Sequence, residues 1–241
     1  MATKKNKPKT ASNRTFFQKL RRFIWKAMLW FFGLSILSVI IFKWVPVPIT
    51  PLMVTRVIES KFDDSETIFS HDWEPLENIS PNLQKAVIAS EDGNFLKHSG
   101  FDFEAMQKAY KNNKKGKRIK GGSTISQQTA KNVFLWQGRS YLRKGLEAYF
   151  TVLIELIWGK ERIMEVYLNS IEMGNGVYGA QEAARHWYST TAKDLTPQQA
   201  AGIAAILPNP RKFKASNSSS YINRRKGKIQ RVMRQIGKIE Y

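Results

Sequence analysis

Two glutamates stand in sequence surroundings that would suit acid–base or electrostatic chemistry, and Glu91 is the first. It follows the apolar run Ala86–Ala89 and precedes Asp92 and Gly93. A carboxylate in such a poorly solvated place would have its pKa raised by desolvation, as a general base requires. The alternative is that Glu91 only accepts hydrogen bonds from the backbone of the turn.

Glu147 is the second glutamate, and its neighbours are cationic. Arg143 and Lys144 stand four and three residues before it, so the three side chains would share one face of a helix. The pattern is typical of a surface cluster of ion pairs. The functional alternative is a cationic platform for a diphosphate that Glu147 orients. Lys131 and Arg139 add positive charge to the same part of the chain.

A glycine turn lies between these two regions. Gly121 and Gly122 precede Ser123, which we expect to cap a helix running to about Phe134. Amide groups at a helix N-terminus favour a bound anion, although a flexible loop is the other interpretation. Gln127 and Gln128 follow, and their paired amides could bind sugar hydroxyls.

The elements that must position these residues are predicted to be mainly α-helical. Ser80 and Pro81 should open a helix ending near Ser90, and Asp102 should cap the next one. Ser140 should cap a long helix to Trp158. The stretch 108–120 holds seven basic residues among thirteen and is predicted to be a loop. The apolar face expected for the long helix comprises Leu142, Leu146, Tyr149, Phe150, Leu153, Ile154 and Ile157.

The N-terminal region has the pattern of a membrane anchor. We predict a basic cytoplasmic tail over 1–22, a transmembrane helix over 23–45 and one domain over 46–241. The basic excess before the helix predicts a cytoplasmic N-terminus and an extracytoplasmic domain. A cleaved secretory signal is the alternative, but the apolar core is long for one and lacks a small-residue cleavage site.

Composition narrows the class of partner. The formal net charge of +20 indicates a polyanion, and the predicted topology favours an anionic membrane or a phosphate-bearing substrate over nucleic acid. The chain has no cysteine, which excludes disulfides, thiolate metal sites and cysteine nucleophiles. With three histidines, no metal site is predicted.

Taken together, four segments resemble the family 51 glycosyltransferases, the peptidoglycan glycosyltransferases. They span about residues 70–210 and follow the family's order. The segments are Glu91-Asp92-Gly93-Asn94-Phe95 with His98, Gly121 to Gln128 with Lys131, Arg143-Lys144-Gly145-Leu146-Glu147, and Glu161-Arg162-Ile163 with Glu165 and Asn169. Many family members have a lysine where this chain has Leu146, so one cationic contact to the leaving diphosphate is in doubt.

The resemblance implies a lysozyme-like, mainly α fold with a smaller, mobile, membrane-proximal lobe. It implies polymerisation of lipid II into β-1,4-linked glycan, with inversion at the donor carbon and release of undecaprenyl diphosphate. Glu91 would be the general base, and Glu147 would orient cations or phosphate. The expected substrate-binding residues are Ser123, Gln127, Gln128, Lys131, Arg139, Arg143 and Lys144. The expected supporting residues are Asp92, Phe95, His98, Glu165 and Asn169.

The same resemblance suggests a monofunctional enzyme of the bacterial inner membrane with a periplasmic catalytic domain. Only 31 residues follow residue 210, and no transpeptidase motif appears. No cofactor is certain, but a divalent cation, Mg²⁺ or Mn²⁺, could bridge Glu147 and phosphate. Expected partners are lipid II, the nascent glycan and membrane lipids, with cell-division or elongation proteins as candidates. A lytic muramidase and a non-enzymatic envelope protein are the competing hypotheses.

Overall fold

The computed structural model describes residues 10–62, 69–114, 122–138 and 140–241. The chain forms two compact units, 1–42 and 43–241. The first unit contains helix α1 (Thr10–Ile41). Its segment Thr15–Ile41 is long and apolar enough to cross a membrane. The helix ends at Ile41, whereas the transmembrane segment was expected to continue to Val45.

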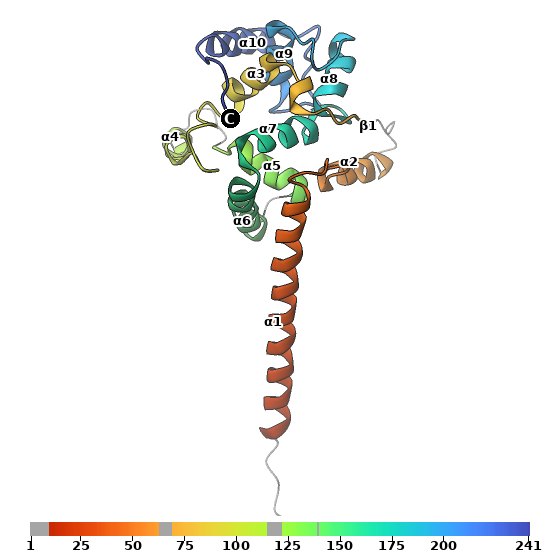
Figure 1. Cartoon of the computed structure of the whole chain (residues 1–241), viewed down its shortest axis with the longest axis vertical. Coiled ribbons are helices and arrows are strands. Elements are labelled where there is room, and N and C mark those ends of the chain that lie inside the picture. Colours follow the sequence, from red (N-terminus) through yellow and green to blue (C-terminus); the bar gives the residue numbers. More distant parts are fainter. Residues whose placement is uncertain (1–9, 63–68, 115–121, 139) are drawn as a thin grey trace, which may run out of the picture. The chain divides into compact units, whose positions relative to one another are not determined.

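The second unit is mainly α-helical, as predicted (Figure 1). A small sheet lies at its edge in the order β1-β3-β2, with β1 parallel and β2 antiparallel to β3. The strands are β1 (Ser70–His71), β2 (Glu172–Gly174) and β3 (Val177–Tyr178). The helices are α2 (Pro51–Phe62), η1 (Leu76–Asn78), α3 (Pro81–Glu91), α4 (Phe103–Lys114), α5 (Ile125–Phe134), α6 (Tyr141–Ile157), α7 (Gly159–Ser170), α8 (Gly179–Tyr188), α9 (Pro197–Ile206) and α10 (Ser220–Met233).

Most of the predicted helix caps are confirmed, and one is wrong. The side chains of Ser80 and Ser140 accept backbone hydrogen bonds at the starts of α3 and α6, and Asp102 does so at α4. At α5 the cap is Thr124 instead of Ser123. Thr124 is the cap because Gln127 stands three residues later, so that each side chain accepts a hydrogen bond from the other residue's backbone amide.

Helix α9 forms the centre of the C-terminal half. It packs against both α3 and α10, and its small residues are fully buried. A Cβ at Gly202 would lie 2.1 Å from the hydroxyl of Tyr188, which donates to the carbonyl of Ala215. Only glycine leaves room for this contact, so α9 can hold α3 and α10 close together.

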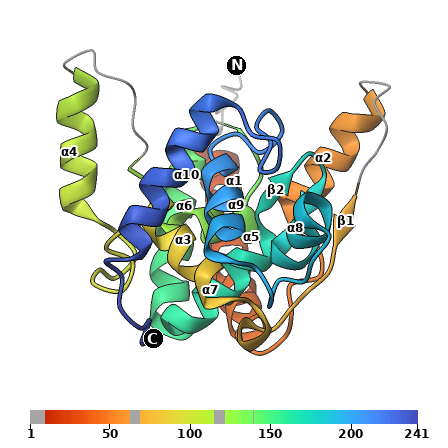
Figure 2. The same ribbon diagram turned by 90° about the horizontal axis from the view of Figure 1, so that it is seen from above.

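Two predictions about individual helices need correction. The basic stretch 108–120 was expected to be a loop, but its first part continues α4 as far as Lys114. Residues 115–121 lie outside the described part of the chain. Figure 2 shows α4 at the edge of the second unit. In α6, Phe150 and Ile154 of the predicted apolar face are buried, but Leu142 is 70% exposed, and the buried stripe also includes Glu147 and Thr151.

Candidate active site

Glu91 is the last residue of α3, and its carboxylate is bound by side chains. The side chain is 15% exposed, which agrees with the poorly solvated place expected for it. Oε1 accepts from Ser90 Oγ at 3.0 Å and lies 3.6 Å from Arg225 Nη2. Oε2 accepts from Gln128 Nε2 at 3.3 Å. These side-chain partners replace the backbone contacts of the alternative interpretation.

Gln128 is itself held in one orientation. The hydroxyl of Tyr167 in α7 donates to Gln128 Oε1 at 3.4 Å. Tyr167 is fully buried, and burial raises its pKa well above the usual value, with the charges of Glu91 and Asp92 adding to the effect. The hydroxyl therefore stays protonated and remains a donor, so the amide nitrogen of Gln128 faces Glu91.

Glu147 is a buried carboxylate rather than a surface one. It is 3% exposed and lies on the inward stripe of α6. Arg143 Nη1 donates to Oε2 at 2.8 Å, and Lys144 Nζ donates to Oε1 at 2.5 Å. The surface cluster of ion pairs considered for these residues is thus wrong for Glu147, although Lys144 is half-exposed.

Lys131 adds a third cation to this group. Burial lowers its pKa, the charge of Glu147 opposes that effect, and the charges of Arg143 and Lys144 reinforce it. Lys131 follows Gln128 by one turn of α5, so both point to the same side of that helix. One face of α5 therefore contacts Glu91 through Gln128 and carries Lys131, whose charge interacts with that of Glu147.

The N-terminus of α5 is occupied by one of the protein's own carboxylates. Asp92 is buried, and its Oδ2 accepts from the amide of Ile125 at 2.9 Å. His98 Nε2 lies 2.9 Å from Asp92 Oδ1. The amides of Thr124 and Gln127 are used in the capping box. The anion expected at this helix end is therefore Asp92, which ties the segment after α3 to α5.

The remaining residues expected to support the site make structural contacts of their own. Phe95 is fully buried beneath Lys160, whose Nζ lies 4.6 Å from the ring centre. Asn169 exchanges hydrogen bonds with the backbone of Glu74, donating at 2.8 Å and accepting at 2.9 Å. Glu165 pairs with Arg162 at 2.6 Å, and burial raises the pKa of Glu165.

Three predicted substrate-binding residues are not among the described contacts of Glu91 and Glu147. Gln127 is 2% exposed, and its amide oxygen accepts a hydrogen bond from the backbone of Thr124 in the cap of α5. Its side chain is therefore not available to bind sugar hydroxyls together with that of Gln128. Ser123 is exposed and precedes the cap. Arg139 lies outside the described residues.

Comparison with known proteins decides the family. The family model described as Transglycosylase matches residues 60–235 of this chain. The chain belongs to the transglycosylase family. It is 56% identical over 224 residues to a biosynthetic peptidoglycan transglycosylase of Pseudomonas syringae pv. syringae, covering 93% of this chain and 95% of the relative. Another biosynthetic peptidoglycan transglycosylase, of Bdellovibrio bacteriovorus, is 54% identical over 92% of this chain and 88% of that protein. The lysozyme-like, mainly α fold expected from the sequence is the fold of this transglycosylase.

The family match reaches α10, which the four segments did not include. Sequence reasoning missed Arg225, although it is the cation that contacts Glu91. The available signal was the basic composition of α10, but helix spacing alone could not show that this helix packs on α3 beside Glu91.

The donor set does not favour a protein-only metal site in this transglycosylase. No group of three or more His, Asp or Glu side chains suited to a metal occurs among the residues that the structure describes. Both oxygens of Glu147 already accept from cationic side chains. A divalent cation at Glu147, Mg²⁺ or Mn²⁺, therefore stays a prediction and would need ligands from the substrate's phosphates.

Proposed function

We propose that this chain polymerises lipid II into β-1,4-linked glycan and releases undecaprenyl diphosphate. The observation that carries the proposal is the arrangement around α5, where Gln128 contacts Glu91 and Lys131 interacts electrostatically with Glu147, which is itself bound by Arg143 and Lys144. A glycosyl transfer needs a base for the incoming hydroxyl and positive charge for the departing diphosphate, and this arrangement serves both.

Glu91 would act as the general base for the acceptor. Its carboxylate takes the proton of the sugar 4-hydroxyl as that oxygen attacks C1 of the donor. Attack from the face opposite the leaving group inverts the anomeric centre from α to β, and no covalent sugar–enzyme intermediate forms. Ser90 and Gln128 hold the two oxygens of Glu91 in place.

The cations around Glu147 would stabilise the leaving group. As the bond between C1 and the phosphate oxygen breaks, negative charge accumulates on the diphosphate. Lys131, Arg143 and Lys144 supply positive charge there, and buried Glu147 keeps Arg143 and Lys144 oriented. A muramidase needs no such cationic group, so this cluster favours transfer over hydrolysis.

The exposed apolar side chains of three helices support contact with a membrane. Phe62 of α2 is 85% exposed, Phe103 of α4 is 73% exposed and Leu156 of α6 is 78% exposed. Basic residues accompany them on α4, which suits an anionic lipid surface. With the apolar helix α1, these side chains support our proposal that the enzyme acts at the bacterial inner membrane, with its catalytic unit on the periplasmic side.

The test is polymerisation of labelled lipid II by the full chain. We expect glycan polymer from the wild type and a loss of about 10²–10⁴-fold for Glu91→Gln, the range for removing a general base. The matched control is Glu77→Gln, which neutralises an exposed glutamate of η1 and should retain activity. Near-normal polymerisation by a folded Glu91→Gln variant would refute the assignment. Release of fragments from purified cell wall, without polymer from lipid II, would favour a muramidase.

A further inference from the structure

Helix α10 brings a concentration of positive charge to the neighbourhood of Glu91. The helix contains five basic residues and no acidic one. Arg225 Nη2 donates to Ser90 Oγ at 2.9 Å, and the same nitrogen lies 3.6 Å from Glu91. The catalytic end of α3 therefore abuts the basic surface of α10.

Two adjoining hollows run along this surface. The first has a volume of about 150 Å³ and the second about 420 Å³. They share Lys228 and Val232 in their linings, so they adjoin, and we call the two together the α10 groove. The first hollow is lined by Ala89, Ser90, Arg225, Lys228, Ile229 and Val232, and the second adds Arg231 and Gln235.

The groove combines free positive charge with an apolar floor. Lys228 and Arg231 are exposed, and in the described part of the chain no carboxylate forms an ion pair with either. Val232, one turn after Lys228, is 38% exposed, and Ile229 is buried. Such a lining suits an extended ligand that carries carboxylates on a partly apolar backbone.

We propose that the α10 groove binds the carboxylate-bearing peptide branch of the acceptor substrate. The proposal rests on the function assigned to Glu91 above. When the 4-hydroxyl of the acceptor lies at Glu91, the rest of the acceptor disaccharide and its attached peptide lie beside Ser90 and Arg225. The peptide ends in a free carboxylate, and the hollow that begins at Ser90 is lined by the cations Arg225 and Lys228 of α10. The diphosphate is assigned to the separate cations around Glu147.

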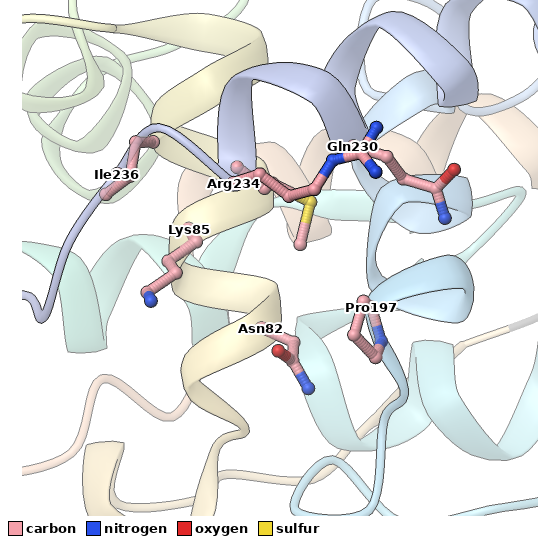
Figure 3. Close-up of a pocket in the computed structure, with 7 residues that line it drawn as sticks. Asn82, Lys85, Pro197, Gln230, Arg234 and Ile236 are labelled. Carbon is pink, nitrogen blue, oxygen red and sulfur yellow. The ribbon is translucent and has the colours of Figure 1, made fainter.

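Another hollow beside α10 provides a control. It has a volume of about 450 Å³ and contains Lys85 and Arg234, as Figure 3 shows. It shares no lining residue with the α10 groove. Lys85 stands six residues before Glu91 on α3, well away from the catalytic end of the helix. Removing its two cations changes the net charge as much as removing those of Lys228 and Arg231.

The experiment compares KM for two substrates, lipid II and lipid II whose peptide carboxylates are converted to amides. For the double variant Lys228→Gln, Arg231→Gln we expect KM for lipid II to rise about tenfold, equivalent to about 1.4 kcal/mol, with kcat little changed. With the amidated substrate, the KM of this double variant should equal the KM of the wild-type enzyme for the same substrate. The double variant Lys85→Gln, Arg234→Gln should leave both KM values unchanged.

Two results would overturn the proposal. An equal rise in KM for both substrates would mean that the groove meets the lipid or its diphosphate, and no rise would mean that it binds no part of the substrate. Binding of the soluble disaccharide-pentapeptide, followed by NMR, gives a readout without catalysis. If the wild type formed no polymer yet bound this compound through Lys228 and Arg231, the proposed function would be refuted, whereas the assignment of the α10 groove as a peptide-binding site would be supported.

Discussion

The hydroxyl of Tyr167 lies 3.4 Å from Oε1 of Gln128 and thereby determines which end of that amide faces the carboxylate of Glu91. The amide nitrogen is consequently directed at Glu91 Oε2. A fully buried tyrosine thus helps to position the carboxylate that we propose as the base.

Removing this hydroxyl should lower activity without unfolding the protein. In Tyr167→Phe the amide of Gln128 loses its anchor, so we expect polymerisation to fall by about fivefold to tenfold, the value of one hydrogen bond of about 1 kcal/mol. Gln128→Met removes the donor to Glu91 and should cost more. The initial rate with lipid II measures both effects, and an unchanged rate for Tyr167→Phe would show that the amide needs no anchor.

Neutralising Glu147 should reduce stability as well as activity. Glu147→Gln leaves Arg143, which is largely buried, without its counter-charge, and breaking such a pair costs about 3 kcal/mol. Urea unfolding of the wild type and the variant gives the difference in free energy of unfolding. Glu91→Gln is the comparison, because Glu91 is less buried and its change should cost much less. Equal losses of stability in the two variants would contradict this account.

Asp92 should behave as a structural residue. Asp92→Ala leaves the amide of Ile125 without its acceptor and removes the partner of His98, so we expect about 2 kcal/mol of lost stability. Asp92→Asn keeps one carbonyl oxygen that can accept from the amide of Ile125, so this variant should lose less stability than Asp92→Ala. Thermal unfolding of the three proteins checks this order. A fully stable but inactive Asp92→Ala variant would instead indicate a direct catalytic role.

The alkaline side of the rate–pH profile should depend on Lys131. Burial lowers its pKa, so the cation is lost as pH rises at a lower pH than for an ordinary lysine, and polymerisation should decline there. Lys131→Arg keeps its charge at any accessible pH and should move this decline to higher pH. Initial rates between about pH 7 and pH 10.5 test it, with Lys193→Arg, an exposed site, as control.

As Lys131 loses its proton with rising pH, the free energy of unfolding should rise while the activity falls. The unfolded chain binds the Lys131 proton more tightly than the folded chain does, so between the two pKa values the free energy of unfolding rises with pH. Lys131→Arg should lack this contribution. A decline in activity that merely follows a decline in stability would therefore contradict the role given to Lys131.

Local sequence determined the helices and most of their ends, because caps and prolines act within one turn. Ser80, Asp102 and Ser140 cap as predicted. It also determined the apolar helix near the N-terminus, because length and composition suffice for that. The cap of α5 was misplaced by one residue because Ser123 and Thr124 are both good caps, and the reciprocal bonds with Gln127 decide between them.

Tertiary structure alone decided what faces each candidate side chain. Spacing put Arg143 and Lys144 beside Glu147, but it could not show whether that face was buried, because burial depends on the helices that cover it. In the same way, Arg225 stands 134 residues after Glu91 in the chain and reaches it only because α9 holds α10 against α3. Contacts between distant segments depend on packing, which local sequence patterns do not encode.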